Sequence, residues 1–190
     1  MRIIAGSHRG RHLCGPQGTT LRPTSDKVRE ALFSILGARV SGRRFLDLYA
    51  GTGAVGIEAI SRGATAVTFV ECDSRALQVL RKNLAACGFE DHAQVRVGRT
   101  ENFLARPDWW DGPYGVVFAD PPYADTQAIE TVRIVWATEL LAEDGVMVIE
   151  QDARAVLPPS VAGAALIRRY LYGDTALFLY GAAPRPGGSA

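Results

Sequence analysis

The residues Asp120-Pro-Pro-Tyr123 directly follow an apolar run over residues 114–119, and their types indicate more than a turn. Prolines lack the backbone N–H that a sheet ladder needs, so they would end a strand here in any protein. That structural explanation does not account for the acid and the aromatic ring on either side of the prolines. These residues are therefore candidates for a functional site.

A second group, Gly51, Gly53 and Gly56, follows another apolar run and has the GxGxxG spacing of a nucleotide-binding loop. Glycine has no Cβ, so the backbone can approach a ligand closely at such a loop. Glu71 ends the next apolar run, where its carboxylate can accept hydrogen bonds from both hydroxyls of a ribose. This combination also fits a nicotinamide dinucleotide, so the loop alone leaves the ligand open.

Asp47 helps to separate these ligands because it lies inside the apolar run that leads to Gly51. A carboxylate at this position would repel a pyrophosphate and attract a cation. S-adenosylmethionine carries an ammonium group and a sulfonium, and it has no phosphate. Asp47 therefore favours S-adenosylmethionine over a dinucleotide, although a buried carboxylate that caps backbone N–H groups would also fit the sequence.

The elements that must position these residues follow from the hydrophobic pattern. Strands are predicted over residues 44–50, 66–71, 93–98, 114–119 and 145–151, and helices over 53–63, 74–88, 100–106 and 126–141. Repeated strand–helix units predict a mostly parallel sheet with helices on both faces and ligands at the carboxyl ends of its strands.

The segments before and after these strand–helix units also have clear patterns. A helix is predicted up to Gly37, with Thr24 or Ser25 as its N-cap, and Ser74 is the predicted N-cap of the helix over 74–88. Residues 165–181 form two apolar runs joined at Gly173-Asp174, which predicts an antiparallel hairpin. The expected fold class is therefore α/β, with a seven-stranded sheet.

Composition limits the classes of protein that fit. The chain has 190 residues, 47% of them hydrophobic, which suits one globular domain. No apolar run reaches the roughly 18 residues of a membrane span, and the basic start lacks the apolar stretch of a signal peptide. Three cysteines without zinc-ligand spacing predict a cytoplasmic protein with no disulfide and no metal site.

The charge is unevenly distributed, since the first thirty residues carry six Lys or Arg against two acids while the whole chain has a net charge of +1. We expect a basic N-terminal arm or hairpin over residues 1–21, a catalytic domain over 22–182 and a disordered tail over 183–190. The arm should contribute little to stability and should bind phosphates through arginine. The candidate RNA-binding residues are Arg2, Arg9 and Arg11 in the arm and Arg22 directly after it.

Taken together, the runs "RPTSDKVREALFSIL", "FLDLYAGTGAVGIEAISRGA", "VTFVECD" and "ADPPY" resemble class I S-adenosylmethionine-dependent methyltransferases. The resemblance is closest to the RsmD family of bacterial 16S ribosomal RNA guanine-N2 methyltransferases, and it omits only the last ten or so residues. It implies a Rossmann-like fold and methylation of 16S rRNA, within the small ribosomal subunit or its assembly intermediate. The family's target is position 966 in the conventional numbering of that RNA, and a monomer is expected.

The resemblance also implies roles for individual residues. The Asp120 carboxylate and the Pro121 carbonyl would accept the hydrogens of the target amine, while Pro122 stiffens the turn and Tyr123 stacks on the flipped base. Cofactor-binding roles fall to Asp47, Tyr49, Gly51, Gly53, Glu71, Cys72, Arg99 and Thr100. Related enzymes often have an acid after the third strand, where this chain reads "VGRT", so recognition of the adenine stays open.

Three alternatives remain at this point. The Asp-Pro-Pro-Tyr motif does not distinguish a guanine from a DNA adenine or a protein glutamine amide, since each presents an amine conjugated to a π system. GxGxxG with Glu71 also fits an NAD-dependent dehydrogenase. A binding module that keeps the fold without turnover is less favoured because the motif is intact.

Overall fold

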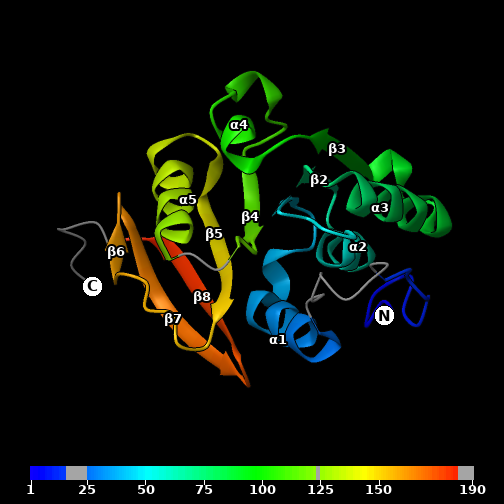
Figure 1. Cartoon of the computed structure of the whole chain (residues 1–190), viewed down its shortest axis with the longest axis horizontal. Coiled ribbons are helices and arrows are strands. Elements are labelled where there is room, and N and C mark those ends of the chain that lie inside the picture. The colour runs from blue at the N-terminus through cyan, green and yellow to red at the C-terminus, as the bar shows by residue number, and fades with distance from the viewer. Residues whose placement is uncertain (16–24, 123–124, 184–190) are drawn as a thin grey trace.

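The computed structural model describes residues 1–15, 25–122 and 125–183, and it builds one sheet with helices on both sides (Figure 1). The helices are α1 (Asp26–Leu36), α2 (Ala54–Ser61), α3 (Ser74–Cys87), α4 (Thr100–Leu104) and α5 (Asp125–Ala137). The strands are β1 (Arg44–Leu48), β2 (Ala66–Glu71), β3 (Ala93–Val97), β4 (Tyr114–Ala119), β5 (Leu141–Asp152), β6 (Ser160–Val161), β7 (Ala164–Tyr172) and β8 (Thr175–Ala182). Short 3-10 turns lie at Gly37–Arg39, Glu90–His92 and Pro107–Trp109.

The strand order β3-β2-β1-β4-β5-β8-β7-β6 confirms the predicted α/β class. The first five strands of this order pair in parallel, and the last three join antiparallel. Strand order reverses between β1 and β4, so a crevice is expected outside their carboxyl ends. The predicted hairpin is confirmed as β7 and β8, but the two-residue β6 makes the sheet eight-stranded rather than seven-stranded.

Helices cover the two faces of the sheet separately. One apolar cluster joins α1, α2 and α3 to strand residues such as Phe45, Val116 and Leu177. The other joins α4 and α5 to residues such as Leu46 and Val117. Neighbouring strand residues belong to different clusters because successive side chains point to opposite faces of a sheet. Both faces are therefore buried, as the continuous apolar strands predicted.

Local sequence signals predicted some helix ends correctly and others not. Ser25 is the N-cap of α1, with its hydroxyl accepting from the Val28 N–H, as predicted. The N-cap of α3 is Asp73 rather than Ser74, because the Asp73 carboxylate accepts from two backbone N–H groups of the first turn. Helix α5 ends at Ala137, short of the predicted 141, since Leu141 already pairs with β4.

The N-terminal segment, defined here as residues 1–15, packs against the body rather than extending from it (Figure 1). The backbone N–H of Ile3 donates to the carbonyl of Arg11, which closes a hairpin-like loop. Ile3 is fully buried and Leu13 is 6% exposed, and both belong to the core that contains α2 and α3. The expectation that this segment adds little to stability is therefore wrong.

Glu58 on α2 holds this segment in place. Its two carboxylate oxygens accept the backbone N–H groups of Ile4 and Ala5 at 2.8 and 2.9 Å. The guanidinium of Arg62 donates to the same carboxylate at 2.7 Å, and the buried Arg29 lies 3.7 Å from it. Glu58 is itself fully buried, so the segment is attached through a charge that has been removed from water.

Candidate active site

The loops that follow β1 and β4 lie next to each other because the two strands are paired in parallel register, with Leu48 opposite Ala119. The Asp120 N–H points to the Leu48 carbonyl at 3.5 Å, which continues the pairing to the start of the Asp-Pro-Pro motif. The glycine loop and the Asp-Pro-Pro motif are far apart in sequence. They therefore meet between β1 and β4, at the switch point where the strand order of the sheet reverses.

Asp47 lies beneath the glycine loop and is 1% exposed. Its carboxylate accepts the backbone N–H of Gly56 at 2.9 Å and so caps the first turn of α2. Burial raises the pKa of Asp47 well above its ordinary value, and the carboxylates of Asp120 and Glu71 raise it further against the Gly56 hydrogen bond. Three acids thus share the negative potential of one site.

Two of the three glycines are required by packing. A Cβ on Gly56 would lie 2.2 Å from the ring of Phe69, and a Cβ on Gly53 would lie 2.1 Å from the Leu80 side chain. Gly51 differs, because a Cβ there would meet nothing within 4 Å, although its φ of +55° is one that glycine adopts most readily. Gly51 is therefore the glycine of this loop with open space in front of it.

Glu71 joins the end of β2 to the glycine loop. One carboxylate oxygen accepts the Gly51 N–H at 2.7 Å. The other accepts the N–H groups of Cys72 and Asp73 at 2.7 and 2.8 Å. Its charge is thus held in a fixed orientation by backbone donors before any ligand binds.

A cavity of about 320 Å³ opens at these strand ends. It brings together six of the predicted site residues, namely Tyr49, Glu71, Cys72, Arg99, Thr100 and Pro122. Two residues that the sequence reading missed, Glu101 and Gln127, also line it. Glu101 supplies an acid directly after the "VGRT" run, which itself contains none.

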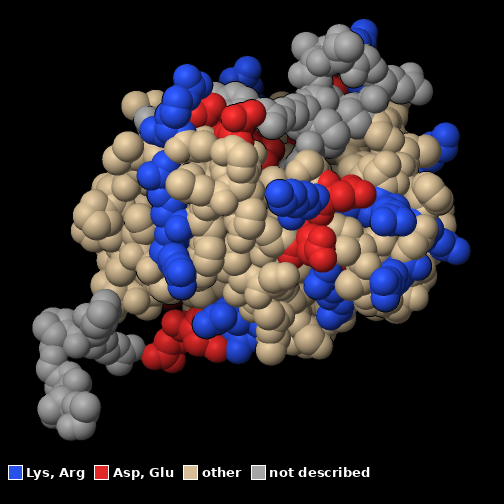
Figure 2. Space-filling view, turned by 90° about the horizontal axis from the view of Figure 1, so that it is seen from below, with Lys and Arg blue, Asp and Glu red and all other residues tan. Residues whose placement is uncertain are grey.

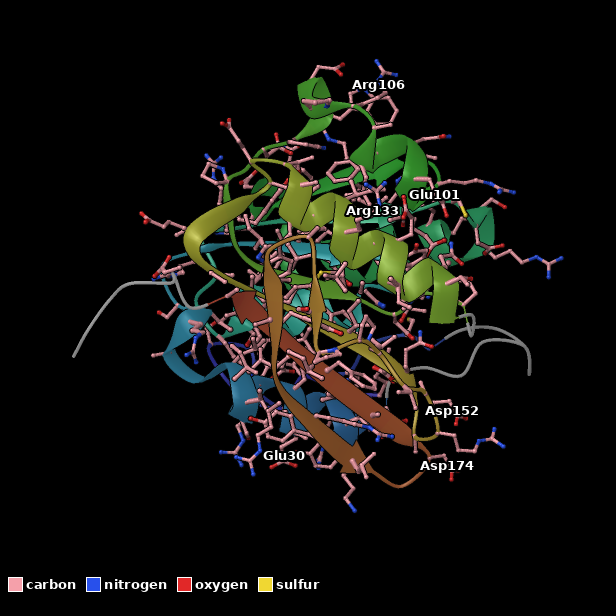
Figure 3. All side chains as sticks on the ribbon, turned by 90° about the vertical axis from the view of Figure 1, so that its left-hand side faces the viewer. Glu30, Glu101, Arg106, Arg133, Asp152 and Asp174 are labelled. Carbon is pink, nitrogen blue, oxygen red and sulfur yellow. The ribbon has the colours of Figure 1, made fainter. Side chains whose placement is uncertain are left out.

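Tyr49 connects this cavity to α5. Its φ of +61° is unusual for a residue other than glycine, and such strain concentrates at functional sites. The Gln127 side-chain amide donates to the Tyr49 hydroxyl at 3.3 Å and to Glu101 at 2.6 Å. Figure 3 shows Glu101 beside α5, so the contact links α4 and α5 across the cavity wall. Burial raises the pKa of the Tyr49 hydroxyl, against the effect of its hydrogen bonds.

The Asp-Pro-Pro motif is described as far as Pro122, and Tyr123 lies outside the described residues. Burial raises the pKa of Asp120 to about 6, so this carboxyl titrates close to neutral pH. The Pro121 carbonyl accepts a hydrogen bond from the Gln151 side chain at 3.2 Å. Gln151 was not predicted, because one glutamine at a strand end carries no signal in a single sequence.

Three of the four predicted RNA-binding arginines lie in the N-terminal segment. Arg2, Arg9 and Arg11 are exposed, and Arg11 donates to the Ala86 carbonyl at the end of α3 at 2.6 Å. Arg22 lies outside the described residues. Figure 2 views the face toward which the arrowheads of β4 and β5 point in Figure 1, and Lys and Arg side chains are spread over much of that face.

No three His, Cys, Asp or Glu side chains among residues 1–15, 25–122 and 125–183 gather closely enough to hold a metal ion. Over the same residues, no helix combines the length and apolar character that crossing a membrane requires.

Known proteins share this sequence and architecture. Residues 1–181 match the family model described as Conserved hypothetical protein 95. Ribosomal RNA small subunit methyltransferase D from Escherichia coli (strain K12) is 37% identical over 180 residues, covering 95% of this chain and 89% of that protein. The protein of the same name from Haemophilus influenzae is 36% identical over 155 residues, covering 80% and 79%. The solved structure of yhhF from Escherichia coli matches with a TM-score of 0.83 and 38% identity, covering 96% of this chain and 97% of that chain.

Proposed function

The chain belongs to the RsmD family, described as Conserved hypothetical protein 95, and on this basis we propose that it is an S-adenosylmethionine-dependent methyltransferase of small-subunit ribosomal RNA. The observation that carries the proposal is the meeting of Asp120 with the glycine loop at the switch point, beside a cavity lined by Glu71.

The acidic side chains at this site fit S-adenosylmethionine better than a dinucleotide. Asp47, Glu71 and Asp120 raise the cost of binding an anion here, since the carboxylates of Asp120 and Glu71 both act on the buried Asp47. A ligand with a sulfonium and an ammonium group relieves this repulsion, whereas a pyrophosphate adds to it. The same argument disfavours the dehydrogenase alternative.

Each cofactor-binding residue has a role in this proposal. Glu71 binds the ribose hydroxyls, while Asp47 and the loop from Tyr49 to Gly53 bind the methionine portion. Cys72 lies with its backbone near the adenine, and Arg99 and Thr100 line the same side of the cavity. Glu101 and Gln127 supply further polar groups beside them, which offers the adenine partners that the "VGRT" run lacked.

The catalytic residues act on the target amine, the exocyclic N2 group of a guanine. Its lone pair is delocalised into the ring, so the free amine is a poor nucleophile. The Asp120 carboxylate and the Pro121 carbonyl accept its two hydrogens and favour a pyramidal nitrogen, while Pro122 stiffens the turn and Tyr123 stacks on the base. When bound, S-adenosylmethionine supplies an electrophilic methyl group. As the N–C bond forms, the methyl–sulfur bond would break and the cofactor would leave as S-adenosylhomocysteine. Asp120 holds the N–H of the alkylated, cationic amine, whose proton passes to solvent.

The RNA partner is 16S rRNA, within a small subunit or its assembly intermediate, and the target follows the family at position 966. Arg2, Arg9, Arg11 and Arg22 contact its phosphates. The protein acts as a monomer in the cytoplasm.

One experiment tests the whole proposal. The protein is given labelled S-adenosylmethionine with naked 16S rRNA, assembled small subunits, duplex DNA or protein, and the modified group is identified. Label in a guanine N2 of 16S rRNA or the subunit is expected. Label in DNA adenine or a protein glutamine would assign the enzyme to another substrate class. Transfer to none of the four substrates would contradict the proposed function.

A further inference from the structure

Gln151 is a buried polar residue near the end of β5, after the apolar stretch of that strand. It follows Val146–Ile149, all buried, and Glu150, and it is itself only 2% exposed. Its side-chain amide nitrogen lies 3.2 Å from the Pro121 carbonyl oxygen, 30 positions earlier in the chain. A buried amide is costly unless it is hydrogen bonded, so this contact accounts for a polar side chain at this position.

The backbone of Gln151 is held in the sheet by β8, two residues beyond the last pairing of β5 with β4 at Ile149. β5 pairs in parallel with β4, and Gln151 lies opposite Ala176 in the antiparallel ladder with β8. Just beyond it, the Ala153 N–H donates to the Asp174 carbonyl at 2.9 Å. Figure 3 shows Asp152 and Asp174 close together at this end of the sheet. The Gln151 amide is therefore presented to the motif from a fixed element.

Pro121 needs such support because its ring fixes only one of its two backbone torsions. The ring sets φ, whereas ψ decides where the carbonyl points. The following Pro122 restricts ψ to the extended region, a range of about 40°. A hydrogen bond to the carbonyl oxygen fixes its direction within that range.

We infer that Gln151 is a positioning residue for methyl transfer, which holds the Pro121 carbonyl where the target amine must donate to it. A carbonyl oxygen has two lone pairs, so it can accept from Gln151 and from the amine at the same time. The inference rests on the proposed function, since it concerns the acceptor for that amine.

The test compares Gln151→Leu with the unmodified protein in the full-length chain. It measures kcat and KM with 16S rRNA, and the affinity for S-adenosylhomocysteine by calorimetry. We expect kcat to fall roughly ten- to a hundredfold, because small misplacements of reacting groups have effects of that size. KM and cofactor affinity should stay within about threefold, since Gln151 touches neither ligand.

Thr68→Val is the matched control. Thr68 is also 2% exposed, and its hydroxyl accepts a hydrogen bond from Tyr114 at 2.9 Å inside the sheet. The variant loses a buried hydrogen bond away from the motif, so its melting temperature should fall while kcat stays unchanged. A loss of kcat in Thr68→Val equal to that in Gln151→Leu would overturn the inference, because lost stability alone would then explain both.

A second variant covers the possibility that leucine prevents folding. Gln151→Asn keeps the amide but is one methylene shorter, so it should lose the contact and show the same fall in kcat. Normal kcat in either folded variant overturns the inference. If the unmodified protein transfers no methyl group to 16S rRNA, the proposed function has failed before any variant is measured.

Discussion

The carboxylate of Glu71 lies 2.7 Å from the backbone nitrogen of Gly51, so the ends of β2 and β1 are joined by one acidic side chain. The same residue lines the cavity and is the proposed ribose ligand. One side chain thus shapes the loop and offers its charge to the cofactor.

Glu71→Ala should weaken S-adenosylmethionine binding roughly ten- to a hundredfold, since charge-assisted hydrogen bonds contribute about 1.5–3 kcal/mol. Calorimetry measures the affinity, and circular dichroism checks that the variant is folded. Glu90→Ala, at an exposed position outside the cavity, is the control and should bind normally. A folded Glu71→Ala protein with full affinity would rule out the ribose assignment.

Activity should rise with pH through about 6, the value to which burial raises the pKa of Asp120. The ionised carboxylate is a stronger hydrogen-bond acceptor than the protonated carboxyl, which also gains an O–H donor, so protonation below this pH weakens the interaction with the target amine. The measurement is kcat/KM against pH, which reports groups of the free enzyme. A profile that stays flat between pH 5 and 8 would contradict the assignment.

Asp120→Asn should reduce methyl transfer, because a neutral amide oxygen is a weaker acceptor than a carboxylate, and should leave cofactor affinity within a few-fold. The same change should raise stability at pH 7 by roughly 1–3 kcal/mol. The folded pKa of Asp120 lies above its ordinary value, so its stabilising contribution is present below pH 4 and is lost as pH rises through about 6. Denaturation curves should therefore differ at pH 7 and converge at pH 3.5, and equal stability at both pH values would argue against a raised pKa.

Glu58→Gln should destabilise the protein by about 3–5 kcal/mol, because it removes the charge of the buried acid beside Arg29, leaves Arg29 paired with the half-exposed Asp26 alone, and weakens the hold on the N-terminal segment. Urea denaturation measures the change. Glu130→Gln is the control, since Glu130 pairs with Arg133 at 2.6 Å on the exposed side of α5 and should hardly affect the midpoint. Similar midpoints for the two variants would show that Glu58 does not anchor the segment.

The RNA-binding proposal is tested with Arg2→Ala and Arg9→Ala together, since deleting the segment would remove Ile3 and Leu13 from the core. Two lost phosphate contacts should weaken RNA affinity and reduce the log–log salt slope by about 1.4–1.8 units. Filter binding at several salt concentrations measures the slope. Arg133→Ala on α5 should leave it unchanged, and an unchanged slope in the double variant would place the RNA elsewhere.

Local patterns predicted most of the elements, because caps and apolar periodicity act over a few residues. Ser25 and Gly37 bound α1 as expected, and Gly173-Asp174 joins β7 and β8. The choice of Asp73 over Ser74 could not be made locally, since both residue types are good N-caps. Which of two adjacent candidates accepts the first N–H groups depends on the direction in which the chain leaves β2.

The contacts that could not be predicted join distant residues. Glycines and exposed arginines over residues 1–15 are typical of a flexible arm, and the segment joins the core through buried Ile3 and Leu13 and through the buried carboxylate of Glu58. Gln151 likewise acquires its contact only when β5 is placed beside β4. Such pairings depend on the sheet order, which no single stretch of sequence encodes.

The attachment of the N-terminal segment also affects how the chain folds during its own synthesis. Ala5 and Arg11 are synthesised before their hydrogen-bond partners Glu58 and Ala86, which lie 53 and 75 positions later in the chain. At about 5–20 residues per second, they wait several seconds for α2 and α3. Through that interval Ile3 and Leu13 have no core to enter, so this is the period in which a nascent chain is exposed to chaperones and proteases.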